Sequence, residues 1–265
     1  MKLSGNTLLI TGGGSGIGRG LAAEFHARGN TVIIAGRRAS VLEETAAAFP
    51  GMKTMVLDIE DGATIPAFTE KLLAAYPGLN GVLHIAGIMR NEDLTADPVS
   101  LVDAEATIAT NLLGPIRLNA ALLPHLIRQQ QATILTVTSG LAFLPLALTP
   151  TYSASKAAIH AYSQALRYQL RETGVQVIEL APPYVQTELM GERQAKDPMA
   201  MPLADYLAET MQLLEAQPDA EEILVERVHR QRFAERNGEH ATFFKMFNDM
   251  TYAARAAEVK AMKAR

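Results

Sequence analysis

A tyrosine and a lysine four residues apart are the residues of this chain best suited to acid-base chemistry. The segment from Ser139 to Lys156 holds a serine at the end of an apolar run, then a proline-bearing loop, then Tyr152 and Lys156. Residues four apart on a helix lie on one face, so the phenol and the ammonium should point the same way. The cation favours phenolate, which would bring the tyrosine pKa toward neutrality and make the phenol a usable acid or base. The same spacing also occurs between ordinary surface neighbours, so the pair alone does not decide between the two interpretations.

The composition bounds the class of protein. The 265 residues are 48% hydrophobic and 20% charged, with a formal net charge of -4. These values are typical of a soluble globular protein, and we predict one domain over residues 1–265. The chain is not basic enough to indicate a nucleic-acid partner. Cysteine is absent and the six histidines are scattered, so we predict neither disulfides nor a metal site.

The apolar segments do not indicate a membrane protein. The longest, over residues 132–148, is interrupted by Thr, Ser, Gly and Pro and is too short and too polar to span a bilayer. No secretory signal follows Met1. We therefore expect a cytoplasmic protein without a membrane segment.

Alternating apolar runs and helical patterns must position the tyrosine and the lysine. Parallel strands need crossover connections and are buried on both faces, so this alternation predicts an α/β fold with a doubly wound parallel sheet and helices on both faces. The six predicted strands cover residues 7–10, 31–35, 52–57, 81–85, 132–137 and 175–180. The helices between them cover residues 21–27, 40–49, 62–76 and 101–129, and a further helix begins at Tyr152.

The last third of the chain has a different character. Residues 184–218 carry several prolines and methionines and a weak helical pattern at 205–214, which predicts a substrate lid. Asp219 and Glu222 have the offset of a capping box and should open a helix that ends at Gly238, before a second helix that runs to about residue 262. No seventh strand is predicted. Residues 219–265 should form a helical C-terminal extension packed on the sheet or on a partner subunit.

A glycine-rich turn, TGGGSGIG over residues 11–18, follows the first predicted strand. Such a turn lets the backbone approach a pyrophosphate, and the following helix offers free N–H groups. Gly12, Gly16 and Gly18 are the candidate positions. Their spacing is G-x-x-x-G-x-G rather than G-x-G-x-x-G, and tight turns also use glycine for steric reasons alone.

The end of the second predicted strand favours NADP over NAD. NAD sites place a carboxylate there for the ribose 2′-hydroxyl, whereas a 2′-phosphate needs a cation and no carboxylate. The chain has Gly36, Arg37 and Arg38 at this position. Arg37 can offer a charge-assisted fork to the phosphate. The alternative is that both arginines only begin a solvated helix.

Together these motifs resemble the Tyr-dependent short-chain dehydrogenase/reductase family, most closely its bacterial DltE-type branch. The resemblance runs from Thr11 to about Pro183 and implies a Rossmann-type sheet with strand order 3-2-1-4-5-6. Its motifs are the glycine turn, Asp58, the HIAG segment at 84–87 where the family usually has NNAG, Asn111, Ser139 and YSASK at 152–156.

The resemblance implies an oxidoreductase that transfers a hydride between a nicotinamide and a carbonyl or alcohol. Tyr152 would donate the proton to the carbonyl, and Lys156 would lower the phenol pKa and bind the nicotinamide ribose. Ser139 would hold the carbonyl oxygen. Asn111 would position a water that links Lys156 to solvent.

It also implies the residues that contact the cofactor. The glycines and Arg37 would hold phosphates, Asp58 the adenine, and Thr187 the carboxamide or the pyrophosphate. The full set is Gly12, Gly14, Ser15, Gly16, Ile17, Gly18, Arg37, Arg38, Asp58, Ile59, Ala86, Gly87, Tyr152, Lys156, Pro182, Val185 and Thr187.

Three departures from the family pattern limit this transfer of roles. His84 and Ile85 replace two asparagines. A histidine with a structural role is more common than a catalytic one, so we expect a structural role for His84. Pro183 stands where glycine is common, which removes an N–H and fixes φ. In many relatives a final strand builds a tetramer interface, and this chain is predicted to lack that strand. We therefore expect a homodimer through the two long helices that begin near Leu101 and Tyr152.

The substrate pocket should lie between the loop 141–151 and the segment after Pro183. Leucines and a phenylalanine in the loop, with methionines in the lid, imply an apolar pocket, although these residues could equally belong to the core. The expected substrate is an aldehyde or ketone of modest polarity. The alternatives are a related epimerase or dehydratase and a nucleotide-sensing protein without turnover. The loop residues are Leu141, Phe143, Leu144, Leu146 and Leu148.

Overall fold

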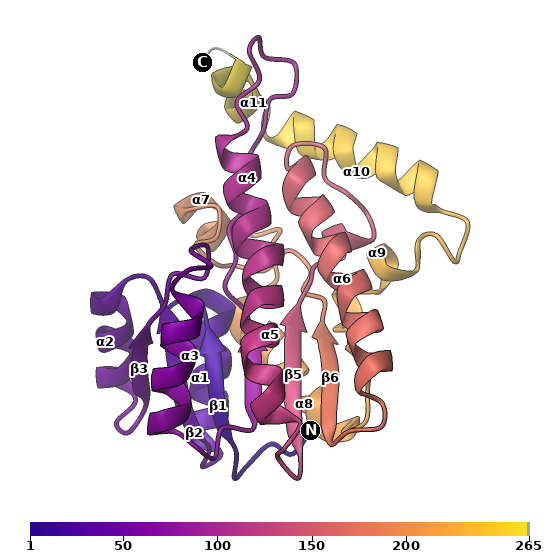
Figure 1. Ribbon diagram of the computed structural model, residues 1–265. Helices are drawn as coiled ribbons and strands as arrows, with labels where there is room; N and C mark the ends of the chain where they lie inside the picture. Colours follow the sequence, from indigo (N-terminus) through magenta and orange to yellow (C-terminus); the bar gives the residue numbers. More distant parts are fainter. Residues whose placement is uncertain (264–265) are drawn as a thin grey trace.

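The computed structural model describes residues 1–263 and contains one parallel sheet (Figure 1). The sheet has seven strands in the order β3-β2-β1-β4-β5-β6-β7, and every neighbouring pair is parallel. This confirms the predicted fold class and its strand order and adds one strand at the edge. The strands are β1 (Thr7–Thr11), β2 (Thr31–Gly36), β3 (Lys53–Val56), β4 (Gly81–His84), β5 (Ala132–Val137), β6 (Val175–Leu180) and β7 (Glu222–Ile223).

Helices cover both faces of the sheet. Successive strand residues point to opposite faces, so Leu9 packs with α3 (Ile65–Ala75), α5 (Gly114–Leu126) and α6 (Pro150–Leu170). Leu8 and Ile10 pack on the other side with α1 (Gly16–Ala27), α2 (Ala39–Ala48) and α8 (Leu203–Ala216). Figure 1 shows α3, α5 and α6 in front of the sheet and α1 and α8 behind it. Within residues 1–263, no helix has the length and hydropathy needed to cross a membrane.

The helix predicted over residues 101–129 is interrupted near its middle. It consists of α4 (Val102–Ile108), the π-helical turn η1 (Ala109–Leu113) and α5, which ends at Leu126. A π turn adds one residue to a helical turn, and such turns occur frequently at functional sites. Asn111 lies within it. The apolar periodicity of the sequence continues through this segment and therefore did not indicate the interruption.

The prediction for residues 219–238 was wrong. Glu222 and Ile223 form β7 instead of opening a helix, and they pair with Glu179 and Leu180 of β6. A two-residue strand is too short to show an alternating pattern, which is why no seventh strand was predicted. The elements that follow are η3 (Glu226–Val228), α9 (His229–Phe233), α10 (His240–Ala254) and α11 (Ala256–Lys263). The short α7 (Glu192–Lys196) lies earlier, between β6 and α8.

Candidate active site

A cleft runs across the carboxyl ends of the strands, where ligands bind in open α/β sheets. Ser139, Tyr152 and Lys156 line one part of it. The structure also brings every residue of the predicted cofactor set to this cleft. These are Gly12, Gly14, Ser15, Gly16, Ile17, Gly18, Arg37, Arg38, Asp58, Ile59, Ala86, Gly87, Tyr152, Lys156, Pro182, Val185 and Thr187.

The glycine turn has both steric and ligand-binding features. Gly12 has φ of 71°, and a Cβ on it would lie 2.8 Å from the backbone nitrogen of Ala86. A Cβ on Gly18 would lie 2.2 Å from the carbonyl oxygen of Gly12, so the first turn of α1 presses directly on the loop before it. Ser15, the residue before α1, makes no side-chain capping bond to that turn. The free N–H groups and the positive end of the helix dipole therefore face the cleft and suit a pyrophosphate.

Arg37 and Arg38 lie at the far end of the cleft, beyond Gly36. The Arg37 side chain is 55% exposed, and its Nη1 lies 3.6 Å from a carboxylate oxygen of Glu60. Asp58 accepts a hydrogen bond from the backbone N–H of Glu60 at 3.1 Å. A carboxylate is therefore near Arg37 although none stands at Gly36. The sequence did not indicate Glu60, because this residue lies after β3 and not at the end of β2, where NAD sites place a carboxylate.

Tyr152 and Lys156 lie side by side on α6, as their spacing predicts. The Lys156 Nζ is 5.6 Å from the centre of the phenol ring and donates a hydrogen bond to the Val137 carbonyl at 2.7 Å. Ser139 follows β5 with an extended backbone, and its hydroxyl accepts a bond from the Leu141 N–H at 3.1 Å. Ser139 lines the cleft together with Tyr152. All three side chains are buried, so their electrostatic interactions are strong.

Burial sets the protonation states of the pair. It raises the pKa of Tyr152 to about 12, against the opposing effect of the Ser139 hydroxyl. Burial also lowers the pKa of Lys156 to about 8, against the opposing charge of Glu179. The expected lowering of the Tyr152 pKa toward neutrality is therefore not found, because desolvation of the phenolate outweighs the effect of the Ser139 hydroxyl. At neutral pH the phenol carries its proton, as a proton donor must.

Asn111 lies directly behind the cleft. Its side chain donates to the Ile88 carbonyl and accepts from the Ile88 N–H, both at 2.9 Å, and also donates to the Ser155 hydroxyl at 3.2 Å. It therefore joins the loop after β4 to α6. Its predicted role in positioning a water stays a prediction.

The two positions that depart from the family pattern have different surroundings. His84 is buried, and its Nε2 lies 2.7 Å from the Asn119 side-chain oxygen on α5. Burial lowers the His84 pKa to about 4, so the ring is neutral. Pro183 lines the cleft beside Pro182, whose carbonyl accepts a bond from the Gly140 N–H at 2.9 Å. His84 therefore has a structural environment, whereas Pro183 shapes the cleft.

Two positioning residues were missed in the sequence. The Glu92 carboxylate accepts bonds from the Thr151 N–H at 3.0 Å and from the Thr151 hydroxyl at 2.6 Å, and so caps α6 one residue before Tyr152. Gln194 on α7 is buried and donates to the Thr187 hydroxyl at 3.1 Å. Neither residue belongs to a motif. Glu92 acts through a contact 59 residues away in the sequence, whereas Gln194 contacts Thr187 seven residues before it.

The apolar side chains of the loop 141–151 pack in two groups and do not line the cleft, contrary to the predicted pocket wall. Leu146 and Leu148 pack with Met89 and Tyr152, next to the partly buried Leu141. In contrast, Leu144 is fully buried and Phe143 contacts the His160 ring edge-on at 4.9 Å. Asn248 of α10 holds this loop through bonds with the Ala147 N–H at 2.7 Å and the Pro145 carbonyl at 3.2 Å. The C-terminal helices therefore contribute to this side of the site.

The four methionines of residues 184–218, the predicted lid, differ in their surroundings. Met190 is partly buried against the cluster around Tyr152, together with Leu189, Phe247 and Val259. Met201 and Met211 are buried elsewhere, and Met199 is 70% exposed. Of the four methionines, Met190 is the one that supports the predicted apolar pocket.

Known proteins share both the sequence and the fold. The family model of the short chain dehydrogenases matches residues 6–198. The uncharacterised oxidoreductase DltE of Bacillus subtilis is 44% identical over 189 residues, which cover 71% of this chain and 75% of DltE. The dehydrogenase/reductase SDR family member 7B of Bos taurus is 31% identical over 69% of this chain, and the match spans 58% of that protein's length.

Solved structures extend the likeness to the whole sheet. A short chain dehydrogenase/reductase from Burkholderia phymatum in complex with NAD is 20% identical, with a TM-score of 0.78 over 90% of this chain and 96% of that one. A short chain dehydrogenase from Burkholderia cenocepacia in complex with NADP is 22% identical, with a TM-score of 0.77 over 91% and 98%. The likeness to these two structures concerns the fold. Taken with the family model and the identity to DltE, it shows that the chain belongs to the short-chain dehydrogenase/reductase family of oxidoreductases.

Proposed function

We propose that the protein is an NADP(H)-dependent oxidoreductase that interconverts a carbonyl compound and its alcohol. The observation that carries this proposal is the buried Tyr152 phenol, next to Lys156 and in the same cleft as Ser139 and the glycine turn. A protonated phenol, a hydroxyl and an ammonium are the groups that carbonyl reduction needs around the substrate oxygen.

The chain's own residues move the proton and stabilise charge. The bound nicotinamide supplies the hydride to the carbonyl carbon, or accepts it in the reverse direction. Tyr152 gives its proton to the carbonyl oxygen, and the Ser139 hydroxyl donates a hydrogen bond to that oxygen as negative charge develops there. The Lys156 cation stabilises the phenolate that remains. In the oxidation direction the phenolate takes the proton back.

Two features support NADP as the preferred cofactor. The first is Arg37, which would bind the 2′-phosphate that distinguishes NADP from NAD. The glycine turn and the N-terminus of α1 would hold the pyrophosphate, which both cofactors contain. The second feature is Gly36. No carboxylate side chain can extend from Gly36 toward the ribose. A bound 2′-phosphate would replace the Glu60 carboxylate as the ion-pair partner of Arg37.

The surroundings of Tyr152 support an aldehyde or ketone of modest polarity. Leu146, Leu148 and Met89 pack around the phenol, with Met190 and Phe247 partly buried beside them. Apolar and flexible side chains bind the body of a substrate without demanding a charge on it. The predicted homodimer stays a prediction.

Replacing the phenol tests the proposal. Tyr152→Phe should bind NADPH as the native protein does but lose nearly all reduction of a panel of aldehydes and ketones, followed by NADPH absorbance. A matched control is Tyr162→Phe, which removes a hydroxyl on the same helix outside the cleft, against Asn119. Turnover by Tyr152→Phe close to the native rate would sink the proposal.

A further inference from the structure

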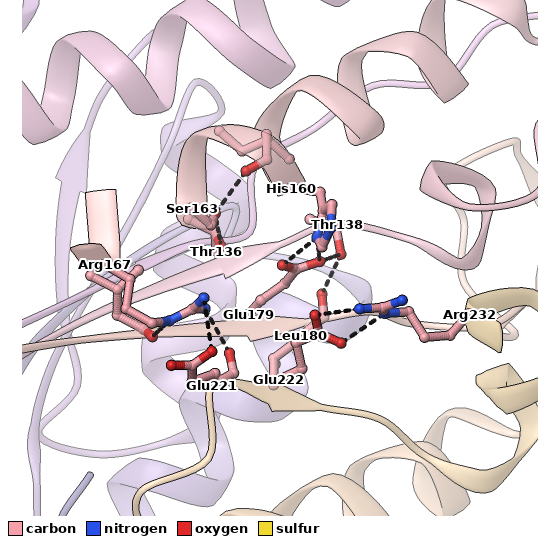
Figure 2. Close-up of polar contacts among 12 residues, drawn as sticks. Thr136, Thr138, His160, Ser163, Arg167, Glu179, Leu180, Glu221, Glu222 and Arg232 are labelled. Atoms are coloured by element: carbon pink, nitrogen blue, oxygen red, sulfur yellow. Dashed lines mark hydrogen bonds and ion pairs between the residues drawn. The ribbon is translucent and has the colours of Figure 1, made fainter. Parts of the chain in front are cut away.

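Figure 2 shows a polar cluster around Glu179, to which His160 and Thr138 are hydrogen-bonded. His160 follows Lys156 by four residues, so Tyr152, Lys156 and His160 occupy successive turns on one face of α6. Glu179 of β6 is fully buried. Its carboxylate accepts hydrogen bonds from the His160 Nδ1 at 2.8 Å and from the Thr138 hydroxyl at 2.6 Å. Nδ1 must carry the proton, since both carboxylate oxygens can only accept.

The same short segment at the end of β5 contacts both Glu179 and the reacting groups. Thr138 stands between Val137, whose carbonyl accepts a hydrogen bond from the Lys156 ammonium at 2.7 Å, and Ser139, which lines the cleft with Tyr152. The Thr138 N–H is also fixed, by a bond to the Leu180 carbonyl at 2.8 Å. A change at the Glu179 carboxylate therefore acts on the segment that holds both Lys156 and Ser139.

The cluster could be taken for a metal site, but an arginine already occupies it. Ligand atoms of His160, Glu179 and Glu222 lie within 4.8 Å of one another. Arg232 of α9, however, donates two hydrogen bonds of 2.8 Å to the Glu222 carboxylate. Its guanidinium also lies over the Phe143 ring at 4.6 Å. A metal ion would have to displace this cation, so charge pairing describes the cluster better than metal ligation.

Glu179 is the buried negative charge that acts on Lys156. An ammonium taken out of water loses its proton easily unless a negative charge lies near it. Burial lowers the pKa of Lys156 to about 8, and the charge of Glu179 acts in the opposite direction. The charged and titratable groups around the cluster are Lys156, His160 and Arg167 on α6, Glu179 on β6, Glu221 and Glu222 at β7, and Arg232 on α9.

We infer that Glu179, held in place by His160 and Thr138, is a positioning residue that keeps Lys156 charged and aligned with Tyr152 during catalysis. The inference rests on the proposed function, because that function requires Lys156 as a cation. It assigns a role to a residue that touches neither substrate nor cofactor. Glu179 acts only through its charge and through the end of β5.

The variant Glu179→Gln removes the charge and nearly preserves the shape. Without the negative charge, Lys156 should lose its proton at a pH about one unit lower. The alkaline limb of kcat/KM for carbonyl reduction should move down with it. Reduction should then fall about fivefold at pH 8 but by less than about 1.5-fold at pH 6, where Lys156 is charged in both proteins. The Lys156 titration itself is followed by NMR of ¹³Cε-labelled lysine, with Lys156→Arg to assign the signal.

The control is Glu221→Gln, which makes the same charge change at a side chain that is 70% exposed. It should leave the Lys156 titration and the alkaline limb in place. Should Glu179→Gln fail to fold, Glu179→Met removes the same charge with an apolar side chain of similar length and should give the same shift. An unshifted Lys156 titration in either folded variant overturns the inference.

The NMR titration of Lys156 requires no turnover, so it remains decisive even if Tyr152→Phe shows that the proposed function is wrong.

Discussion

Arg37 offers a quantitative test of cofactor choice. The substitution Arg37→Ala removes the cation that would bind the 2′-phosphate of NADP, and it leaves the glycine turn and the catalytic pair untouched. A hydrogen bond to a charged group contributes about 1.5–3 kcal/mol. Binding the phosphate also requires Arg37 to leave Glu60, and an exposed ion pair of this kind contributes about 0.2–1 kcal/mol. The net loss in Arg37→Ala is therefore about 0.5–3 kcal/mol.

This loss corresponds to a roughly 2- to 100-fold weaker NADPH affinity, with about tenfold as the central expectation. The Kd values for NADPH and NADH are measured by quenching of the bound nicotinamide's fluorescence or by calorimetry. NADH should bind within about twofold of its native affinity, because it has no 2′-phosphate for Arg37 to bind.

Two variants bracket the result. Glu60→Gln frees Arg37 from its competing carboxylate and should strengthen NADPH binding about 1.5- to 5-fold. Arg128→Ala makes the same substitution at an exposed arginine outside the cleft and should change neither Kd. If Arg37→Ala left the ratio of NADPH to NADH affinity unchanged, Arg37 would not determine the cofactor preference and the reasoning would be refuted.

The capping bonds of α6 and the glycine turn give two further predictions. Glu92→Ala removes both bonds to Thr151 and should lower the free energy of unfolding by about 1–2 kcal/mol, seen as a fall in Tm of about 2–8 °C by calorimetry; an unchanged Tm would contradict the capping role. Gly18→Ala places a Cβ 2.2 Å from the Gly12 carbonyl, so the turn must shift and NADPH affinity should fall more than about tenfold. Gly78→Ala, with 3.9 Å to the nearest atom, is the control, and equal NADPH affinity in both glycine variants would argue against the tight turn.

The sequence was sufficient to predict the central sheet and the arrangement of the reacting groups. Strands such as Thr31–Gly36 are buried on both faces and consist largely of apolar residues, and helical segments separate them in the sequence. The positions of Tyr152 and Lys156 follow from helical periodicity alone. Strand hydrophobicity and helical periodicity depend on residues that are close together in the sequence, so both can be recognised from the sequence alone.

Features that depend on distant contacts could not be predicted in the same way. Glu179 looks like one polar residue within an apolar strand, and its partner His160 stands 19 residues away on another element. The raised pKa of Tyr152 depends on how completely the folded protein buries the phenol. β7 forms because Glu222 and Ile223 pair with the edge of β6. A sequence pattern of two residues is too short to predict this pairing.

Hydride transfer from the nicotinamide to a carbonyl carbon is tested most directly with deuterium-labelled cofactor. The native protein is incubated with a carbonyl compound that it reduces and with NADPH carrying deuterium at both C4 positions, and the alcohol is analysed by mass spectrometry. We predict one deuterium in each molecule of alcohol, bound to the former carbonyl carbon, and loss of this product in Tyr152→Phe. Alcohol formed without deuterium would contradict hydride transfer at this site.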